Sequence, residues 1–249
     1  TVISTRAARR LGVSEIARGG TSQGFGGSGH FPIVYGLLKS IQLGDLKVQA
    51  IPCFIRPFHT VKGSSEPEAD GFIGLSILSN FLTELDYKDS LLRLDRNFDR
   101  APEAASPDVT VIPFRTTQNG LISIETEIED NHRINAILDS ASGSVVLSTA
   151  AVERFKLRDK IIKNQTARVI GAAGIAPNVP MLIVRNWGVA DLEQKNMRAL
   201  VLDFGAINET SGFEQGGIIG GDFLKNYRVT IDFARTEVRF QPHTANLKN

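Results

Sequence analysis

The chain contains one stretch twice, and this internal repeat constrains the fold more than any other feature of the sequence. Residues 71–94, GFIGLSILSNFLTELDYKDSLLRL, align with residues 217–240, GIIGGDFLKNYRVTIDFARTEVRF, at an offset of 146. Most non-identical positions keep an apolar residue opposite an apolar residue. The seven identical pairs are Gly71/Gly217, Ile73/Ile219, Gly74/Gly220, Leu78/Leu224, Asn80/Asn226, Asp86/Asp232 and Arg93/Arg239. We therefore expect two similar halves that bury their apolar residues in the same pattern.

A second match extends the repeat to the start of each half. Residues 2–13 align with residues 146–157 at an offset of 144, with five identities. At this offset the counterpart of Asp139 has the position 139 − 144 = −5. The first half therefore lacks the strand pair and the loop that precede residue 146 in the second half. Either the sequence is a fragment of a longer polypeptide, or the first half has lost this strand pair; we expect the former, an N-terminally incomplete sequence.

Local patterns predict mainly β structure with short helices. Residues 122–128 alternate apolar and polar side chains, and Asp130-Asn131 offers a turn into a second strand that ends near residue 138, as in a β-hairpin. Ser148 or Thr149 can cap a short helix over 150–155, and Ser4 or Thr5 can cap its counterpart over 6–11. Further along the chain we expect strands at 182–189 and 197–204, a short helix at 222–227 and a hairpin around 232–237.

These elements predict two lobes, residues 1–96 and residues 109–249. Between them, residues 97–108 are rich in Pro, Ala, Asp and Ser and show no periodicity, so they are predicted to be a linker.

Composition excludes several classes of protein. The net charge is +1 and there is no basic block, so nucleic acid is not an expected partner. No apolar run reaches the roughly 18 residues of a membrane-spanning helix, and the first residues do not form a signal peptide. The single Cys53 lies in an apolar run and is expected to be buried and inert. The four histidines are scattered, so no metal site is predicted.

Asp139 is preceded in the sequence by bulky apolar residues and followed by small residues. It follows Ile137-Leu138, and the five residues after it are Ser, Ala, Ser, Gly and Ser. An Asp-Ser pair at a strand end is commonly a turn cap, which is the ordinary interpretation of such a residue. The duplicated framework and the downstream stretch Ile218-Ile219-Gly220-Gly221 favour a functional role instead. Asp86 and Asp232, which lie before turns in β-patterned runs, are interpreted as structural.

Together these motifs resemble the retropepsin-like (clan AA) aspartic proteases, in the bacterial form that fuses two lobes in a single chain. The family signature is two hydrophobic residues, Asp, Thr or Ser, Gly, and Ala or Ser, followed later by two hydrophobic residues and Gly. Residues 137–142 fit the first element, apart from Ala141, and both 218–220 and 72–74 fit the second. The resemblance implies a mainly β fold with two pepsin/retropepsin-like acid-protease barrels and short helices. It also implies an aspartic-type endopeptidase that acts on peptides or proteins without a cofactor.

The resemblance also assigns roles to residues. Asp139 would be catalytic, activating a water together with a second aspartate expected upstream of residue 1, or supplied by a complementing N-terminal segment or a second chain. Ser140 and Ala141 would support this dyad. The family usually has Gly at the position of Ala141, and alanine adds a methyl group and gives up ready access to positive φ. A two-lobed peptide-binding or scaffold protein without catalytic activity is the alternative.

Two glycine-rich stretches occupy matching places in the halves. By resemblance they mark flap hairpins that close over a bound peptide, whereas an ordinary glycine hairpin is an equally open interpretation. The candidate flap residues are Gly24, Gly26, Gly27, Gly171, Ala172, Ala173 and Gly174.

Two other motifs match the first glycine-rich segment. Gly24-x-Gly26-x-x-Gly29 fits a dinucleotide fingerprint, and Gly20-x-Ser22-x-Gly24 fits the nucleophile elbow of a serine hydrolase. We reject both, because residues 14–23 are too polar for a preceding strand and no helix is expected to follow. The bacterial relatives are often exported, which weakly favours a periplasmic or secreted location and leaves the compartment open.

Overall fold

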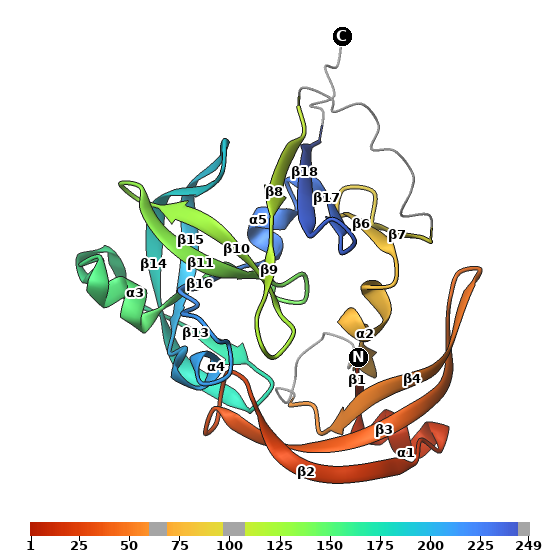
Figure 1. Cartoon of the computed structure of the whole chain (residues 1–249). Coiled ribbons are helices and arrows are strands. Elements are labelled where there is room, and N and C mark those ends of the chain that lie inside the picture. The colour runs from red at the N-terminus through yellow and green to blue at the C-terminus, as the bar shows by residue number, and fades with distance from the viewer. Residues whose placement is uncertain (60–68, 97–107, 244–249) are drawn as a thin grey trace. The chain divides into compact units, whose positions relative to one another are not determined.

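The computed structural model describes residues 1–59, 69–96 and 108–243, and its elements are shown in Figure 1. Of the expected linker 97–108, all but Asp108 lies outside the described residues. The chain separates into two compact units. Unit 1 comprises Thr1–Asn80 and Arg168–Pro177, and unit 2 comprises Phe81–Ala167 and Asn178–Asn249. The two units are defined by contacts between residues, whereas the lobes 1–96 and 109–249 were predicted from the sequence repeat. The lobe boundaries therefore stay a prediction.

Unit 1 is built on a five-stranded sheet in the order β2-β3-β4-β1-β5. Figure 1 shows β2, β3 and β4 as long neighbouring strands in red to orange. Strand β1 pairs in parallel with β4 and antiparallel with β5. The small hydrophobic core of unit 1 includes Ile3, Ala7, Cys53 and Ile55. The elements are β1 (Val2–Ser4), α1 (Thr5–Leu11), β2 (Glu15–Gln23), β3 (His30–Leu43), β4 (Leu46–Arg56), β5 (Gly71–Phe72) and α2 (Leu75–Leu78).

The second sheet has eight strands in the order β13-β14-β15-β12-β16-β11-β10-β9. It belongs to unit 2, except that the tip of the β13–β14 hairpin, residues 168–177, is grouped with unit 1. Trp187, Leu182 and Ile219 are fully buried in it. The elements are β9 (Arg115–Thr116), β10 (Ile122–Ile128), β11 (His132–Leu138), β12 (Val146–Ser148), α3 (Thr149–Arg154), η1 (Arg158–Lys160), β13 (Ile161–Ile170), β14 (Ile175–Val189), β15 (Leu192–Leu202), α4 (Gly205–Asn208), β16 (Gly217–Ile219) and α5 (Gly221–Leu224).

A third sheet, also in unit 2, joins strands from both copies of the repeat. Its order is β7-β6-β17-β18-β8. Strands β6 and β17 are repeat counterparts, and they pair antiparallel with Arg228 opposite Asp86. The elements are β6 (Leu82–Asp86), β7 (Leu91–Asp95), β8 (Thr110–Pro113), β17 (Tyr227–Asp232) and β18 (Glu237–Pro242).

The repeat is visible in the backbone as well as in the sequence. Strands β1 and β12 each pair in parallel with one strand and antiparallel with another, in corresponding registers. The hydroxyls of Ser4 and Ser148 cap α1 and α3, each accepting the N–H of the third following residue at 3.0 Å. Residues with positive φ recur at the repeat offsets, as the pairs Gly12/Lys156, Gly44/Ala190, Ala50/Asn196 and Ser90/Thr236. The duplicated, mainly β fold expected from the sequence is confirmed.

One local prediction was wrong. Residues 15–23 form strand β2, although their polar composition was taken to exclude a strand before the glycine-rich segment. Strand β2 is the edge of its sheet and is mostly exposed, so it needs no apolar alternation. The segment after the glycines is strand β3, not a helix, so the dinucleotide fingerprint still lacks its phosphate-binding helix. Within the described residues, no helix is long and apolar enough to cross a membrane.

Candidate active site

Asp139 lies directly after the central strand β11. On one side β11 pairs antiparallel with β10, and on the other side it pairs in parallel with β16, with Leu138 opposite Ile219. The ladder continues for one more residue, because the N–H of Asp139 donates to the carbonyl oxygen of Ile219 at 3.0 Å. The hydrophobic pairs of the two signature elements therefore lie side by side and fix where Asp139 leaves the sheet.

A tight loop follows Asp139 and folds back on its carboxylate. The N–H of Ala141 donates to Oδ1 of Asp139 at 2.9 Å, and the N–H of Ser142 donates to the carbonyl oxygen of Asp139 at 3.2 Å. The hydroxyl of Ser142 donates to the carbonyl oxygen of Ser144 at 2.9 Å. The interpretation of Asp139 as a turn cap therefore describes its hydrogen bond correctly, and this bond is compatible with a catalytic role.

The loop is attached to the second signature element. The N–H of Gly221 donates to the carbonyl oxygen of Ser142 at 2.7 Å, and the N–H of Asp222 donates to that of Gly143 at 3.0 Å. A Cβ on Gly220 would lie 2.3 Å from the carbonyl oxygen of Ser144, closer than real contacts allow. Glycine is therefore required at 220 by the close approach of the loop, which explains this part of the motif.

The surroundings of Asp139 favour its protonated form. Burial raises the pKa of Asp139, and the N–H groups of Ala141 and Ser142 lower it by a smaller amount. Among the described residues, no second carboxylate contributes to this shift. The arrangement can therefore hold a proton on an aspartate at the end of a strand.

The two residues that follow Asp139 are at the surface of unit 2. Ser140 and Ala141 are both exposed, and Ala141 is not among the residues with positive φ. The loop thus needs no left-handed conformation at 141, and alanine causes no backbone strain there. The support of a dyad by Ser140 and Ala141 stays a prediction.

The glycine-rich stretches form the tips of hairpins β2–β3 and β13–β14, and the two tips contact each other within unit 1. The N–H of Ala173 donates to the carbonyl oxygen of Phe25 at 3.0 Å. A Cβ on Gly26 would lie 2.2 Å from the carbonyl oxygen of Gly174, and one on Gly171 would lie 2.1 Å from that of Phe25. The structure thus brings together all seven candidate flap residues, Gly24, Gly26, Gly27, Gly171, Ala172, Ala173 and Gly174. Their role as flaps stays a prediction.

Arg56, which the sequence analysis did not single out, holds one of these tips. Its Nη1 donates to the carbonyl oxygen of Ala172 at 3.1 Å. Its guanidinium lies over the rings of Phe31 and Phe58, at 5.4 and 4.8 Å from their centroids. An arginine at the end of a half-buried strand is too ordinary a signal to have identified it.

The other candidates lie elsewhere. Asp86 and Asp232 close turns, accepting backbone N–H groups of following residues, which fits a structural role. Ser22 lies within strand β2 opposite Phe31, so it is not at a strand-to-helix elbow. Cys53 is buried, and burial raises the pKa of its thiol. Among the described residues, no group of three or more His, Cys, Asp or Glu could hold a metal ion.

Comparisons with known proteins agree with this geometry. Residues 124–223, which span Asp139 and Gly220, match the family model described as aspartyl protease. No curated protein sequence matches the chain significantly. Among solved structures, an aspartic proteinase from Irpex lacteus is 11% identical with a TM-score of 0.53, covering 95% of this chain and 84% of that chain. A retropepsin-like aspartic protease from Rickettsia conorii is 15% identical with a TM-score of 0.40, covering 56% of this chain and 97% of that chain. The resemblance to aspartic proteases is confirmed for residues 124–223, and the likeness to the Irpex protein shows the fold.

Proposed function

We propose that this chain, whose residues 124–223 carry the aspartyl protease pattern, is the larger part of an aspartic endopeptidase in which Asp139 supplies one of two catalytic carboxyls. The observation that carries the proposal is the half-buried Asp139, held at the end of a central strand with a raised pKa. A carboxyl group whose pKa is shifted by its surroundings is typical of catalytic sites. Peptides or proteins are the proposed substrates.

The chemistry requires a second carboxyl close to Asp139. Two such groups a few ångströms apart cannot both ionise readily, so they share one proton. The ionised member removes a proton from a water molecule that attacks the peptide carbonyl carbon, and the protonated member donates to the carbonyl oxygen. We propose that the second carboxyl belongs to a segment preceding residue 1, at the position −5 that the repeat assigns to it.

Unit 1 has a surface that fits such a segment. In unit 2, Val184, Trp187 and Val189 on β14 are fully buried. Their repeat counterparts on β3 are Leu38, Ile41 and Leu43, and all three are only partly buried. Strand β10 pairs with β14 beside Trp187, whereas no strand takes that place among the described residues of unit 1. A strand equivalent to β10 would bury this apolar face.

The edge of strand β5 supports the same conclusion. Phe72 on β5 is 41% exposed, whereas its counterpart Ile218 on β16 is 4% exposed. The difference arises because β16 lies between β12 and β11, while β5 ends its sheet. A strand added in parallel to β5, in the register of Leu138 opposite Ile219, would place its following aspartate next to Ile73. The added hairpin would thus bring the second loop to unit 1.

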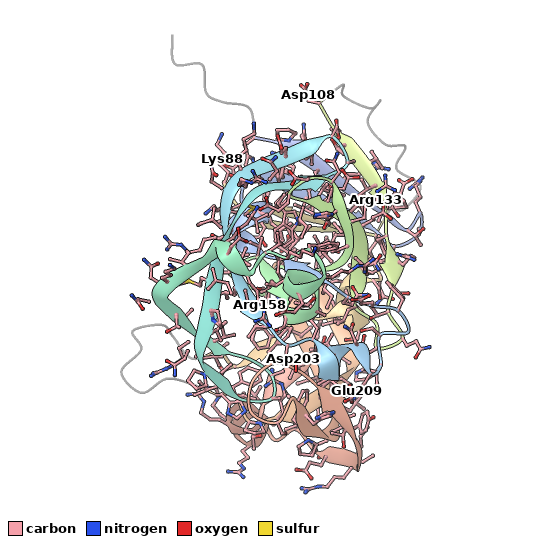
Figure 2. The ribbon with its side chains drawn as sticks, turned by 90° about the vertical axis from the view of Figure 1, so that its left-hand side faces the viewer. Lys88, Asp108, Arg133, Arg158, Asp203 and Glu209 are labelled. Carbon is pink, nitrogen blue, oxygen red and sulfur yellow. The ribbon has the colours of Figure 1, made fainter. Side chains whose placement is uncertain are left out.

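The test is peptide hydrolysis at acidic pH by protein expressed with its upstream codons. Asp139→Asn should abolish cleavage, because asparagine cannot share the proton. The matched control is Asp203→Asn. Asp203 is exposed, its Oδ1 accepts the N–H of Gly205 at 2.8 Å as Asp139 accepts that of Ala141, and Figure 2 shows it beside α4. This control should cleave normally. Cleavage that survives Asp139→Asn and is insensitive to pepstatin would reject the proposal.

The second candidate is a two-lobed peptide-binding protein without catalytic activity. The observation that favours it is Ala141, which stands where the family usually has glycine. Isothermal titration with peptide pools distinguishes the two functions, because this candidate binds peptides that stay intact after long incubation. Peptide fragments in the same samples would exclude it.

A further inference from the structure

A tyrosine hydroxyl contacts the loop that follows Asp139. Tyr87 lies in the turn between β6 and β7, and its hydroxyl donates to the carbonyl oxygen of Ser140 at 3.4 Å. Both residues belong to unit 2, although 53 positions separate them in sequence. The family signature does not include this position.

The turn that carries Tyr87 is anchored on both sides. Asp86 is 2% exposed, and its Oδ1 accepts the N–H groups of Lys88 and Asp89 at 3.0 and 3.1 Å. Its Oδ2 accepts Nε of Arg228 at 2.9 Å, from the strand opposite. Because these bonds fix the backbone on either side of Tyr87, the ring is presented to the loop from a rigid support.

The contact acts on the peptide group next to the catalytic carboxyl. The carbonyl of Ser140 and the N–H of Ala141 belong to one planar amide. The carbonyl accepts the Tyr87 hydroxyl, and the N–H donates to Oδ1 of Asp139. A donor on the carbonyl oxygen polarises the amide and strengthens its N–H as a donor, so the two hydrogen bonds support each other.

The hydroxyl keeps its proton wherever Asp139 titrates. Burial raises the pKa of Tyr87, and the negative charge of Asp139 raises it further. Tyr87 is therefore a constant donor to Ser140.

The other copy of the repeat lacks this hydroxyl. The counterpart of Tyr87 at the offset of 146 is Phe233, whose ring packs edge-on against Phe114 with centroids 5.5 Å apart. The duplicated framework is thus chemically unequal at this position, because Phe233 has no hydroxyl to donate.

We propose that Tyr87 is a positioning residue, which holds the Ser140–Ala141 amide so that its N–H points at the carboxylate of Asp139. This inference rests on the proposed function. The contact makes the Asp139 carboxylate a better stabilised anion than it would be without the Tyr87 hydroxyl, and it thereby favours Asp139 as the member that takes the proton from the attacking water. This stabilisation comes from a side chain outside both signature elements.

The test is a carbon-13 NMR titration of the Asp139 carboxyl in the 249-residue chain. Tyr87→Phe keeps the ring and removes the donor, so the pKa of Asp139 should rise by roughly a few tenths of a unit. The matched control is Tyr227→Phe, which removes another hydroxyl of unit 2, one that accepts Nε2 of Gln194 at 2.8 Å. This control should leave the Asp139 titration unchanged. An Asp139 pKa that is unchanged or lowered in Tyr87→Phe overturns the inference.

Activity adds a separate readout in protein expressed with its upstream codons. Tyr87→Phe should shift the acidic limb of the pH profile of kcat/KM upward, with KM nearly unchanged. A shifted titration in a protein that never cleaves peptides retains the positioning role and rejects the proposed function. Cleavage whose pH profile is the same in wild type and Tyr87→Phe rejects the positioning role and leaves the proposed function standing.

Discussion

Replacing Gly220 by alanine tests whether the close approach of the Asp139 loop is essential. The added Cβ would lie 2.3 Å from the carbonyl oxygen of Ser144 and 2.7 Å from that of Ser142. Ordinary contacts begin near 3.4 Å, so the gap must open by 3.4 − 2.3 = 1.1 Å. Both neighbours are backbone atoms, and they cannot rotate away as a side chain could.

The expected cost has two parts. Forcing extra volume into a packed site destabilises a protein by about 1–3 kcal/mol, and Gly220→Ala should lower the free energy of unfolding by that amount. A displacement of the loop by about 1 Å would also move Asp139, and such a misplacement can reduce a rate by about 10²-fold. We therefore expect both the stability and the peptide cleavage of the upstream-extended protein to fall.

Gly143→Ala is the matched control in the same loop. A Cβ at 143 meets no atom within 4 Å, and Gly143 does not have positive φ. Its free energy of unfolding should change by no more than about 0.5 kcal/mol. Urea unfolding can be followed by fluorescence, because the single Trp187 is fully buried in unit 2. The reasoning would be refuted by equal urea midpoints for Gly220→Ala and Gly143→Ala, together with a carbon-13 resonance of the Asp139 carboxyl that is the same in Gly220→Ala as in the wild type.

Three further experiments, two substitutions and one labelling reaction, probe ionisable side chains shielded from solvent. Because burial raises the pKa of Asp139, protonation of this carboxyl stabilises the folded protein. The stabilisation is complete below the unfolded-state pKa of about 3.9, and it is lost as the pH rises through the folded-state pKa. Over this pH range the urea midpoint of Asp139→Asn should therefore rise relative to that of the wild type. Burial opposes ionisation of Asp86, but the N–H of Asp89 and the guanidinium of Arg228 outweigh it and lower the pKa of Asp86. Arg228→Ala should therefore cost about 1–3 kcal/mol at neutral pH, with the deficit shrinking as acid protonates Asp86; a deficit independent of pH would contradict this. Cys53 should react with a maleimide only after urea is added, and rapid labelling of the native protein would show that its thiol is accessible.

Local patterns predicted elements well where each strand or helix has one buried face. The hairpin through residue 138 and the serine caps of α1 and α3 agree with the structure. Strand β2 was missed because an exposed edge strand is held by backbone hydrogen bonds and needs no apolar pattern. The predicted helix over 222–227 is shorter and earlier, at Gly221–Leu224, because the chain enters β17 at Tyr227.

The contacts of the site could not be predicted to the same extent. The repeat paired Tyr87 with Phe233, yet nothing in the sequence indicates that a turn after β6 reaches the carbonyl of Ser140. The contact between the glycine-rich tips is of the same kind, since Phe25 and Ala173 are brought together by two separate hairpins. Such pairs depend on the positions of whole strands.

The sequence by itself determined the duplicated register, the aspartate at a strand end and the need for small residues around it. These properties are local or repeat at a constant offset, so they can be recognised along the chain. Only the tertiary structure decided that Gly220 lies against the carbonyl oxygens of Ser142 and Ser144 and that a tyrosine hydroxyl reaches the amide beside Asp139. The physical reason is that strand pairing, which brings distant segments within hydrogen-bonding distance, depends on the whole sheet and not on any one stretch.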